Sequence, residues 1–154
     1  MADLDNIQFG VDLKKFARTI DLSVAKVVRK VSLDVFRGVL EKTPVDTGAA
    51  RASWQIGVNR KSDAKVTVTG GKMSKGGASA IANKQTSKLS TVNAYDEVII
   101  SNNVPYAQKL EYGGYLPKNT DKLVGGFSKQ APRGMARITL IEIAQAMTKT
   151  LKDL

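Results

Sequence analysis

The stretch TPVDTGAARASW, residues 43–54, decides the fold because it joins a helical pattern to a strand-like one. Pro44 ends the preceding helix, since the residue before a proline is pushed out of helical backbone angles. Asp46 and Thr47 can accept hydrogen bonds from the backbone amides that follow, and Gly48 allows angles that a side chain forbids. The stretch therefore predicts a helix-to-strand corner, with the chain's only tryptophan in the core.

Arg51 is harder to explain by a corner alone. It stands among small residues, where its guanidinium could bind a carboxylate or backbone carbonyls of a neighbouring subunit. Two interpretations of the stretch therefore stay open, a structural corner and a contact surface.

Before the corner, residues 11–42 predict one long helix of about 45 Å. Apolar residues recur there at spacings of three and four, the pattern of a helix with one buried stripe. The basic residues fall mostly off this stripe. The predicted buried stripe is Leu13, Phe16, Ile20, Val24, Val27, Val31 and Val35.

After the corner, the pattern becomes strand-like. Alternating apolar residues predict strands at 53–58, 64–70 and 96–101, within a sheet region that spans residues 54–101. The segment at about 70–93 is rich in Gly, Ser, Lys and Thr, so we expect a long, flexible, basic loop there.

Two more helices are expected toward the end of the chain. Asn103 could cap a short helix that buries Tyr106 and Leu110 and ends at Gly113 and Gly114. Residues 131–154 predict a C-terminal helix with Pro132 in its first turn. Its predicted buried stripe is Ala136, Leu140, Ala144, Met147 and Leu151. Together these elements predict a single α+β domain over residues 1–154, with a small, mostly antiparallel sheet and long loops.

Composition narrows the chemistry of the 154-residue chain. It has no cysteine and no histidine, so disulfides, thiolate or imidazole metal ligands and the usual neutral-pH general base are absent. The 14 acidic residues form no catalytic or metal-binding pattern that we recognise, so we expect no enzyme activity, cofactor or metal. We also expect no membrane span and synthesis in the cytoplasm. The net charge of +10 favours contact with nucleic acid or an acidic protein surface.

Two blocks of sequence carry a family resemblance. The first block is TPVDTGAARASW and the second, about 50 residues later, is NNVPYAQKLEYG, followed by the closing helix. Together they resemble the tail-completion or neck proteins of tailed bacteriophages, whose pattern is roughly T-P-V-D-T-G-x-L-R-x-S-W and then N-x-x-x-Y-A-x-x-x-E-x-G. Ala50 departs from that pattern, and SKQAPRGM before the closing helix matches only at Pro132 and Arg133. The resemblance covers residues 10–60 and 95–150.

The resemblance implies a non-catalytic virion protein at the head–tail junction, made in the host cytoplasm. It would join the tail tube to the head connector as part of a cyclic ring of about six or twelve copies. Its partners would be other copies of itself, the connector, and the tail-tube or terminator proteins, with DNA in the channel as a further candidate. A tail terminator or stopper of the same junction is the alternative, and a basic DNA-binding protein is the alternative of another class.

Candidate contact residues follow from both lines of reasoning. We hypothesise that Arg51 and Glu111 pair, within or between subunits. The candidate interface residues are Asp46, Thr47, Arg51, Trp54, Tyr106, Glu111 and Tyr112. The candidates for a basic loop that faces DNA or an acidic partner are Arg60, Lys61, Lys72, Lys75, Lys84 and Lys88, although a solvated loop would explain these lysines equally well.

Overall fold

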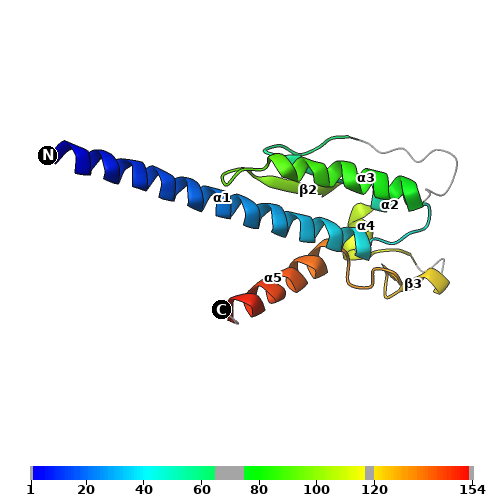
Figure 1. Ribbon diagram of the computed structural model, residues 1–154. Helices are drawn as coiled ribbons and strands as arrows, with labels where there is room; N and C mark the ends of the chain where they lie inside the picture. Colours follow the sequence, from blue (N-terminus) through cyan, green and yellow to red (C-terminus); the bar gives the residue numbers. More distant parts are fainter. Residues whose placement is uncertain (1, 65–74, 117–119, 153–154) are drawn as a thin grey trace.

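The computed structural model describes residues 2–64, 75–116 and 120–152. A single helix, α1 (Ala2–Lys42), begins nine residues before the predicted start and ends where Pro44 requires. The other elements gather around its C-terminal half, and its N-terminal half extends beyond them (Figure 1). The fold is α+β and rich in helix, as the sequence predicts.

The corner after α1 forms as predicted. Gly48 adopts a left-handed conformation with φ of 86° and precedes a short helix, α2 (Ala49–Ala52), which leads into strand β1 (Trp54–Val58). A residue with a side chain would be strained at Gly48, so glycine is required there by the backbone.

The sheet that β1 enters is small and antiparallel. Strand β1 pairs with β2 (Val98–Asn102), with Ile56 opposite Ile100. A second pair, β3 (Leu123–Val124) and β4 (Phe127–Ser128), forms a hairpin that the sequence did not predict. The strand predicted at 64–70 falls, apart from its first residue, outside the described residues.

The prediction of a flexible loop at about 70–93 is wrong over most of that range. Helix α3 (Lys75–Ser87) and a 3₁₀ turn, η1 (Lys88–Thr91), occupy it, while residues 70–74 lie outside the described part. The Gln85 side-chain oxygen accepts the backbone N–H of Ile56 at 3.0 Å, and Leu89 and Val92 are buried in the core. Contacts with β1 therefore stabilise a segment whose glycine and serine content gives it little helical propensity of its own.

The core lies between α1, the sheet and η1. Its fully buried side chains include Phe36 and Val39 from α1 and Ile56 from β1. On α1 the buried line is therefore Ala25, Ser32, Phe36 and Val39, and Thr43 continues it just after the helix. The predicted buried stripe is wrong where side chains are described, because Ile20, Val24 and Val27 are exposed and Val31 and Val35 are half-buried.

Helix α4 (Ala107–Tyr112) ends at Gly113, as predicted. Its N-cap position is held by Tyr106, which is exposed, so the predictions that Asn103 caps the helix and that Tyr106 is buried are wrong. Asn103 instead donates to the carbonyls of Ser62 and Ala64 at 2.9 and 3.1 Å. This amide links the loop after β1 to the segment before α4.

Beyond α4 lie η2 (Thr120–Lys122) and the last helix, α5 (Ala136–Lys152). Helix α5 starts five residues later than predicted, since Gly134 has a φ of 84° and Pro132 lies before the first turn. It contacts α1 through Thr139, which faces Gly38, and through an ion pair of 2.6 Å between Glu142 and Lys42. The predicted buried stripe of α5 is wrong at Leu140, Ala144 and Met147, which are exposed.

Candidate functional site

The corner at residues 43–54 is held together from within the chain. The indole N–H of Trp54 donates to the Thr43 hydroxyl at 2.7 Å, and that hydroxyl donates to the Val39 carbonyl. Arg51 donates through Nη2 to the Thr43 carbonyl at 3.0 Å, across the bend. Trp54 and Thr43 are buried, so these contacts fix the angle between α1 and β1.

The second block is tied to the first through neighbouring amides. The side chain of Asn102 donates to the Ala50 carbonyl at 2.7 Å and accepts the backbone N–H of Val104 at 3.1 Å. Because Asn102 ends β2 and Ala50 lies in α2, the two sequence blocks, far apart along the chain, lie side by side. This convergence defines the candidate site.

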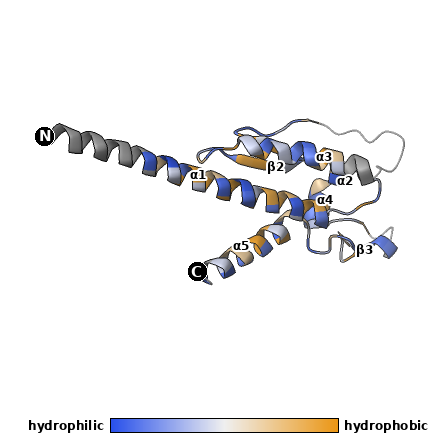
Figure 2. Cartoon of the chain, viewed as in Figure 1, coloured by the Kyte–Doolittle hydropathy of each residue, from blue (hydrophilic) through white to orange (hydrophobic). Residues whose placement is uncertain are grey.

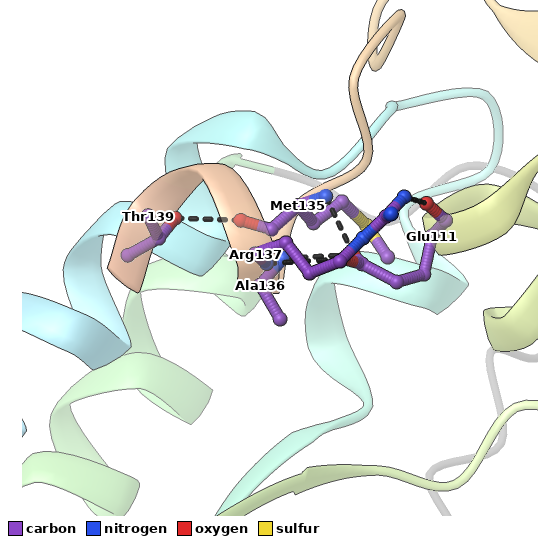
Figure 3. A network of polar contacts seen from close by, with 5 residues as sticks. All are labelled: Glu111, Met135, Ala136, Arg137 and Thr139. Atoms are coloured by element: carbon purple, nitrogen blue, oxygen red, sulfur yellow. Dashed lines mark hydrogen bonds and ion pairs between the residues drawn. The ribbon is translucent and has the colours of Figure 1, made fainter. Parts of the chain in front are cut away.

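Glu111 is the most connected polar side chain of the site (Figure 3). Its carboxylate accepts the backbone N–H groups of Met135, Ala136 and Arg137 at 2.6, 2.8 and 3.0 Å, and the Nε of Arg137 at 3.0 Å. Arg137 also donates to the Glu111 carbonyl at 2.6 Å, and its guanidinium lies 4.7 Å from the centre of the Tyr112 ring. Glu111 thus satisfies the free amides at the start of α5, where a negative charge is also favoured by the helix dipole.

The pairing predicted between Arg51 and Glu111 is wrong within the chain, because Arg137 is the partner of Glu111. Burial by itself raises the pKa of the Glu111 carboxyl, but the hydrogen bonds from Arg137, Met135 and Ala136 outweigh it and leave the pKa below its ordinary value. Gly134 allows this approach, since a Cβ at that position would lie 2.5 Å from the Glu111 carbonyl oxygen. The sequence RGMAR, which carries both Gly134 and Arg137, was the missed signal.

The two blocks together form one wall of a groove of about 920 Å³. The opposite wall comes from the loop after α4 and the β3–β4 hairpin, and the Gln130 side chain closes one side by accepting the backbone N–H of Val45 at 2.8 Å. Exposed apolar side chains of Val45, Tyr106 and Leu116 line the groove beside the charges of Asp46 and Lys129. The lining residues are 44–50, Tyr106, Leu110, 115–116, 121–123 and 128–130.

The predicted interface residues divide into two groups around this groove. Asp46, Thr47, Tyr106 and Tyr112 are exposed, and the first three of these line the groove. Arg51, Trp54 and Glu111 have hydrogen-bond partners within the chain. They support the wall of the groove without lining it. The groove mixes apolar and charged groups, and among the described residues there is no group of three or more acidic side chains that could hold a metal. Such a surface suits contact with another protein.

A second surface of interest runs along α1. Ile20, Val24, Val27 and Val31 recur at helical spacing on the same face as Gly38, where α5 docks through Thr139. Helix α5 diverges from α1 beyond that contact (Figure 1), and the side chains of Ile20 and Val27 are 46% and 56% exposed. We call Ile20, Val24, Val27 and Val31 the open stripe of α1.

Helix α5 has exposed apolar side chains too. Leu140, Ile141 and Met147 are all exposed, and Leu140 is 53% exposed. The hydrophobic segments of both helices are visible in Figure 2. Single apolar residues scattered over a surface are normal. Several exposed apolar side chains on each of two helices are characteristic of an interaction surface. No helix in the described part of the chain has the length and apolarity needed to cross a membrane.

The predicted basic loop residues belong to different elements of the structure, although Arg60, Lys61 and Lys88 line one pocket beside β1. Arg60 and Lys61 are exposed after β1, Lys75 and Lys84 belong to α3, and Lys72 lies outside the described residues. Lys88 is drawn inward, where its Nζ donates to the Ile56 carbonyl at 3.0 Å and to Gln85 Oε1 at 2.8 Å. Burial, followed by the charge of Lys84, lowers the pKa of Lys88. Lys88 is therefore a structural contact, and Lys84 remains available at the surface.

Comparisons of the chain with protein-family models, with curated proteins and with solved structures found no match. The functional argument therefore depends on the sequence blocks and on the surfaces described above.

Proposed function

We propose that this chain is a structural subunit of the head–tail junction of a tailed bacteriophage. It would act there as a neck or tail-completion protein that joins the tail tube to the head connector within a ring. The observation that carries the proposal is the open stripe of α1, which continues the face on which α5 docks but is left largely uncovered by the described part of the chain, with Ile20, Val24 and Val27 exposed and Val31 half-buried. A long helix with such a stripe is stabilised when a neighbouring subunit covers it.

The two sequence blocks support the same proposal in another way. Their convergence at one groove places the exposed residues Asp46, Thr47 and Tyr106 on a single surface. In a ring, each subunit uses one surface to contact the preceding subunit and a different one to contact the next. The open stripe and the groove provide two such different surfaces.

Counting copies in purified phage particles tests this function. Quantitative mass spectrometry should find the protein at a low, fixed ratio to the major capsid protein, corresponding to about six or twelve copies per particle. Absence from mature particles would overturn the proposal. A tail terminator or stopper of the same junction would also be found at low copy number, and crosslinks to the tail tube alone would favour the terminator.

The ring surface is tested separately by solution mass. We expect the double variant Val27→Asp and Leu140→Asp to lose any self-association that the wild-type chain shows in light scattering, because both apolar positions would carry a charge. The control is Ser23→Asp with Thr148→Asp, which adds the same charge at exposed polar positions of the same helices. Equal effects of the two pairs would mean that net charge, rather than the apolar surface, controls association.

A further inference from the structure

The basic residues of α1 form a row of their own. Lys26, Arg29, Lys30 and Arg37 recur at helical spacings of three, four and seven, so they share one face of the helix. The row spans 11 residues, which is about 16 Å along the axis. Its face is different from that of the open stripe.

This row borders a groove of about 520 Å³ between α1 and α3. Arg29, Lys30 and Arg37 line the groove from α1. The opposite wall comes from the end of α3, where Asn83 faces the groove, and from η1. Leu33 and Leu89 also line it. None of the described residues that line the groove is acidic.

The cations at the groove differ in whether their side chains already have a hydrogen-bond or ion-pair partner within the chain. Arg29 donates through Nε to the Val92 carbonyl at 2.8 Å, which fixes its guanidinium at the groove, and Lys30 forms an ion pair with Asp34. Lys26, Arg37 and Lys84 are exposed, and their side chains have no hydrogen-bond or ion-pair partner among the described residues. Lys84 does not line the groove, but it adds an exposed cation to α3, the helix that forms this wall.

We propose that this groove binds the phosphate backbone of a double-stranded nucleic acid. A row of cations about 16 Å long covers the axial length of several phosphates of one duplex strand, which recur every 3.4 Å or so along the axis. Guanidinium and ammonium groups are the usual partners of phosphate oxygens, and contacts of this kind read no sequence. The described lining residues include no aromatic side chain, so they offer no platform for the stacked bases of a single strand.

The proposal is independent of the ring. It needs only one folded chain, because every residue of the groove comes from α1, α3 and η1. A failure to bind duplex would leave the ring proposal standing, and a monomeric chain could still bind duplex.

The test measures binding of a short, fluorescein-labelled, mixed-sequence DNA duplex by anisotropy across a salt series from about 50 to about 200 mM. The groove variant carries Lys26→Ala, Arg37→Ala and Lys84→Ala, all at exposed positions; Arg37 lines the groove, Lys26 belongs to the same row of α1, and Lys84 lies on α3. The control carries Lys129→Ala, Lys149→Ala and Lys152→Ala, which are also exposed and remove the same charge elsewhere. Circular dichroism verifies that both variants fold.

We expect the groove variant to weaken binding and to reduce the slope of log affinity against log salt by about 2.7, which corresponds to three lost phosphate contacts. The control should shift the affinity much less and leave the slope unchanged. Equal losses in both variants would overturn the proposal, because they would show attraction by net charge alone. Tighter binding of polyglutamate than of duplex at the same salt concentration would also overturn it, in favour of an acidic protein partner.

Discussion

The two halves of α1 share one helix and one apolar periodicity, yet the structure uses them differently. In the C-terminal half, Phe36 and Val39 are fully buried against the sheet and η1. In the N-terminal half, Ile20 and Leu22 lie exposed, and Val27, just inside the C-terminal half, is exposed too because the described body of the protein does not cover its face of the helix. Apolar spacing therefore indicates which faces of a helix can be buried, and the neighbouring elements determine which of them is buried.

The largest expected effect comes from the packed half. Phe36→Ala should lower the free energy of unfolding by about 3–5 kcal/mol, because it removes a fully buried ring and leaves a cavity. Denaturant unfolding at a concentration where the chain is monomeric measures this loss.

An identical substitution at a buried and at an exposed valine of α1 sharpens the comparison. Val39→Ala should cost about 2 kcal/mol, whereas Val27→Ala should change stability by less than about 0.5 kcal/mol. A large cost at Val27 in a monomer would show that its face is covered within the chain, and the case for a neighbouring subunit would fail.

An effect smaller than that of Phe36→Ala is expected where α5 is anchored beside the packed half. Glu111→Gln should cost about 2–3 kcal/mol, because it removes the charge that accepts three backbone amides and pairs with Arg137. Arg137 is itself about half exposed, which keeps the cost below that of a fully buried pair.

The pH dependence of this cost follows from the lowered pKa of Glu111. A group whose pKa is depressed by folding stabilises the protein above its unfolded pKa, here about 4.5, and that contribution is lost as the pH falls through the folded pKa. The difference in unfolding free energy between wild type and Glu111→Gln should therefore be full near neutral pH and should shrink below about pH 4.5. A difference independent of pH would mean that the charge of Glu111 contributes nothing.

A smaller effect than that of Glu111→Gln is expected at the contact between α1 and α5. A Cβ at Gly38 would lie 2.5 Å from the Thr139 methyl carbon, so Gly38→Ala should cost about 1–2 kcal/mol despite the better helix propensity of alanine. Adding Thr139→Ser removes that methyl group and keeps the hydroxyl that donates to the Met135 carbonyl. Stability should then recover in part, and simple additivity of the two changes would contradict the contact.

Local signals in the sequence predicted several features correctly. The corner formed where Pro44 and Gly48 required it, α4 ended at Gly113, and the sheet is small and antiparallel. These features depend on backbone angles or on alternation within a few residues, which the chain encodes locally. The burial of Trp54 was predicted for the same reason.

The failures occurred where packing overrides local preference. Helix α3 has two glycines near its start and no strong apolar stripe, and Gln85 and Leu89 hold its C-terminal end against β1 and the core. Glu111 was expected to meet Arg51 because both stood out in the sequence, but the start of α5 brought Arg137 to it instead. A partner that is 26 residues away along the chain is determined by the tertiary arrangement, which no local pattern reports.

By itself, the sequence determined that a long helix, a sharp corner, a small sheet and a closing helix would form, and that chemistry based on histidine or cysteine is absent. Only the tertiary structure decided which face of α1 is buried, that the lysine-rich segment holds a helix, and that the two motifs meet at one groove. The physical reason is one of range. Backbone angles and helix propensities act over a few residues, whereas burial is decided by elements that the fold brings together from distant parts of the chain.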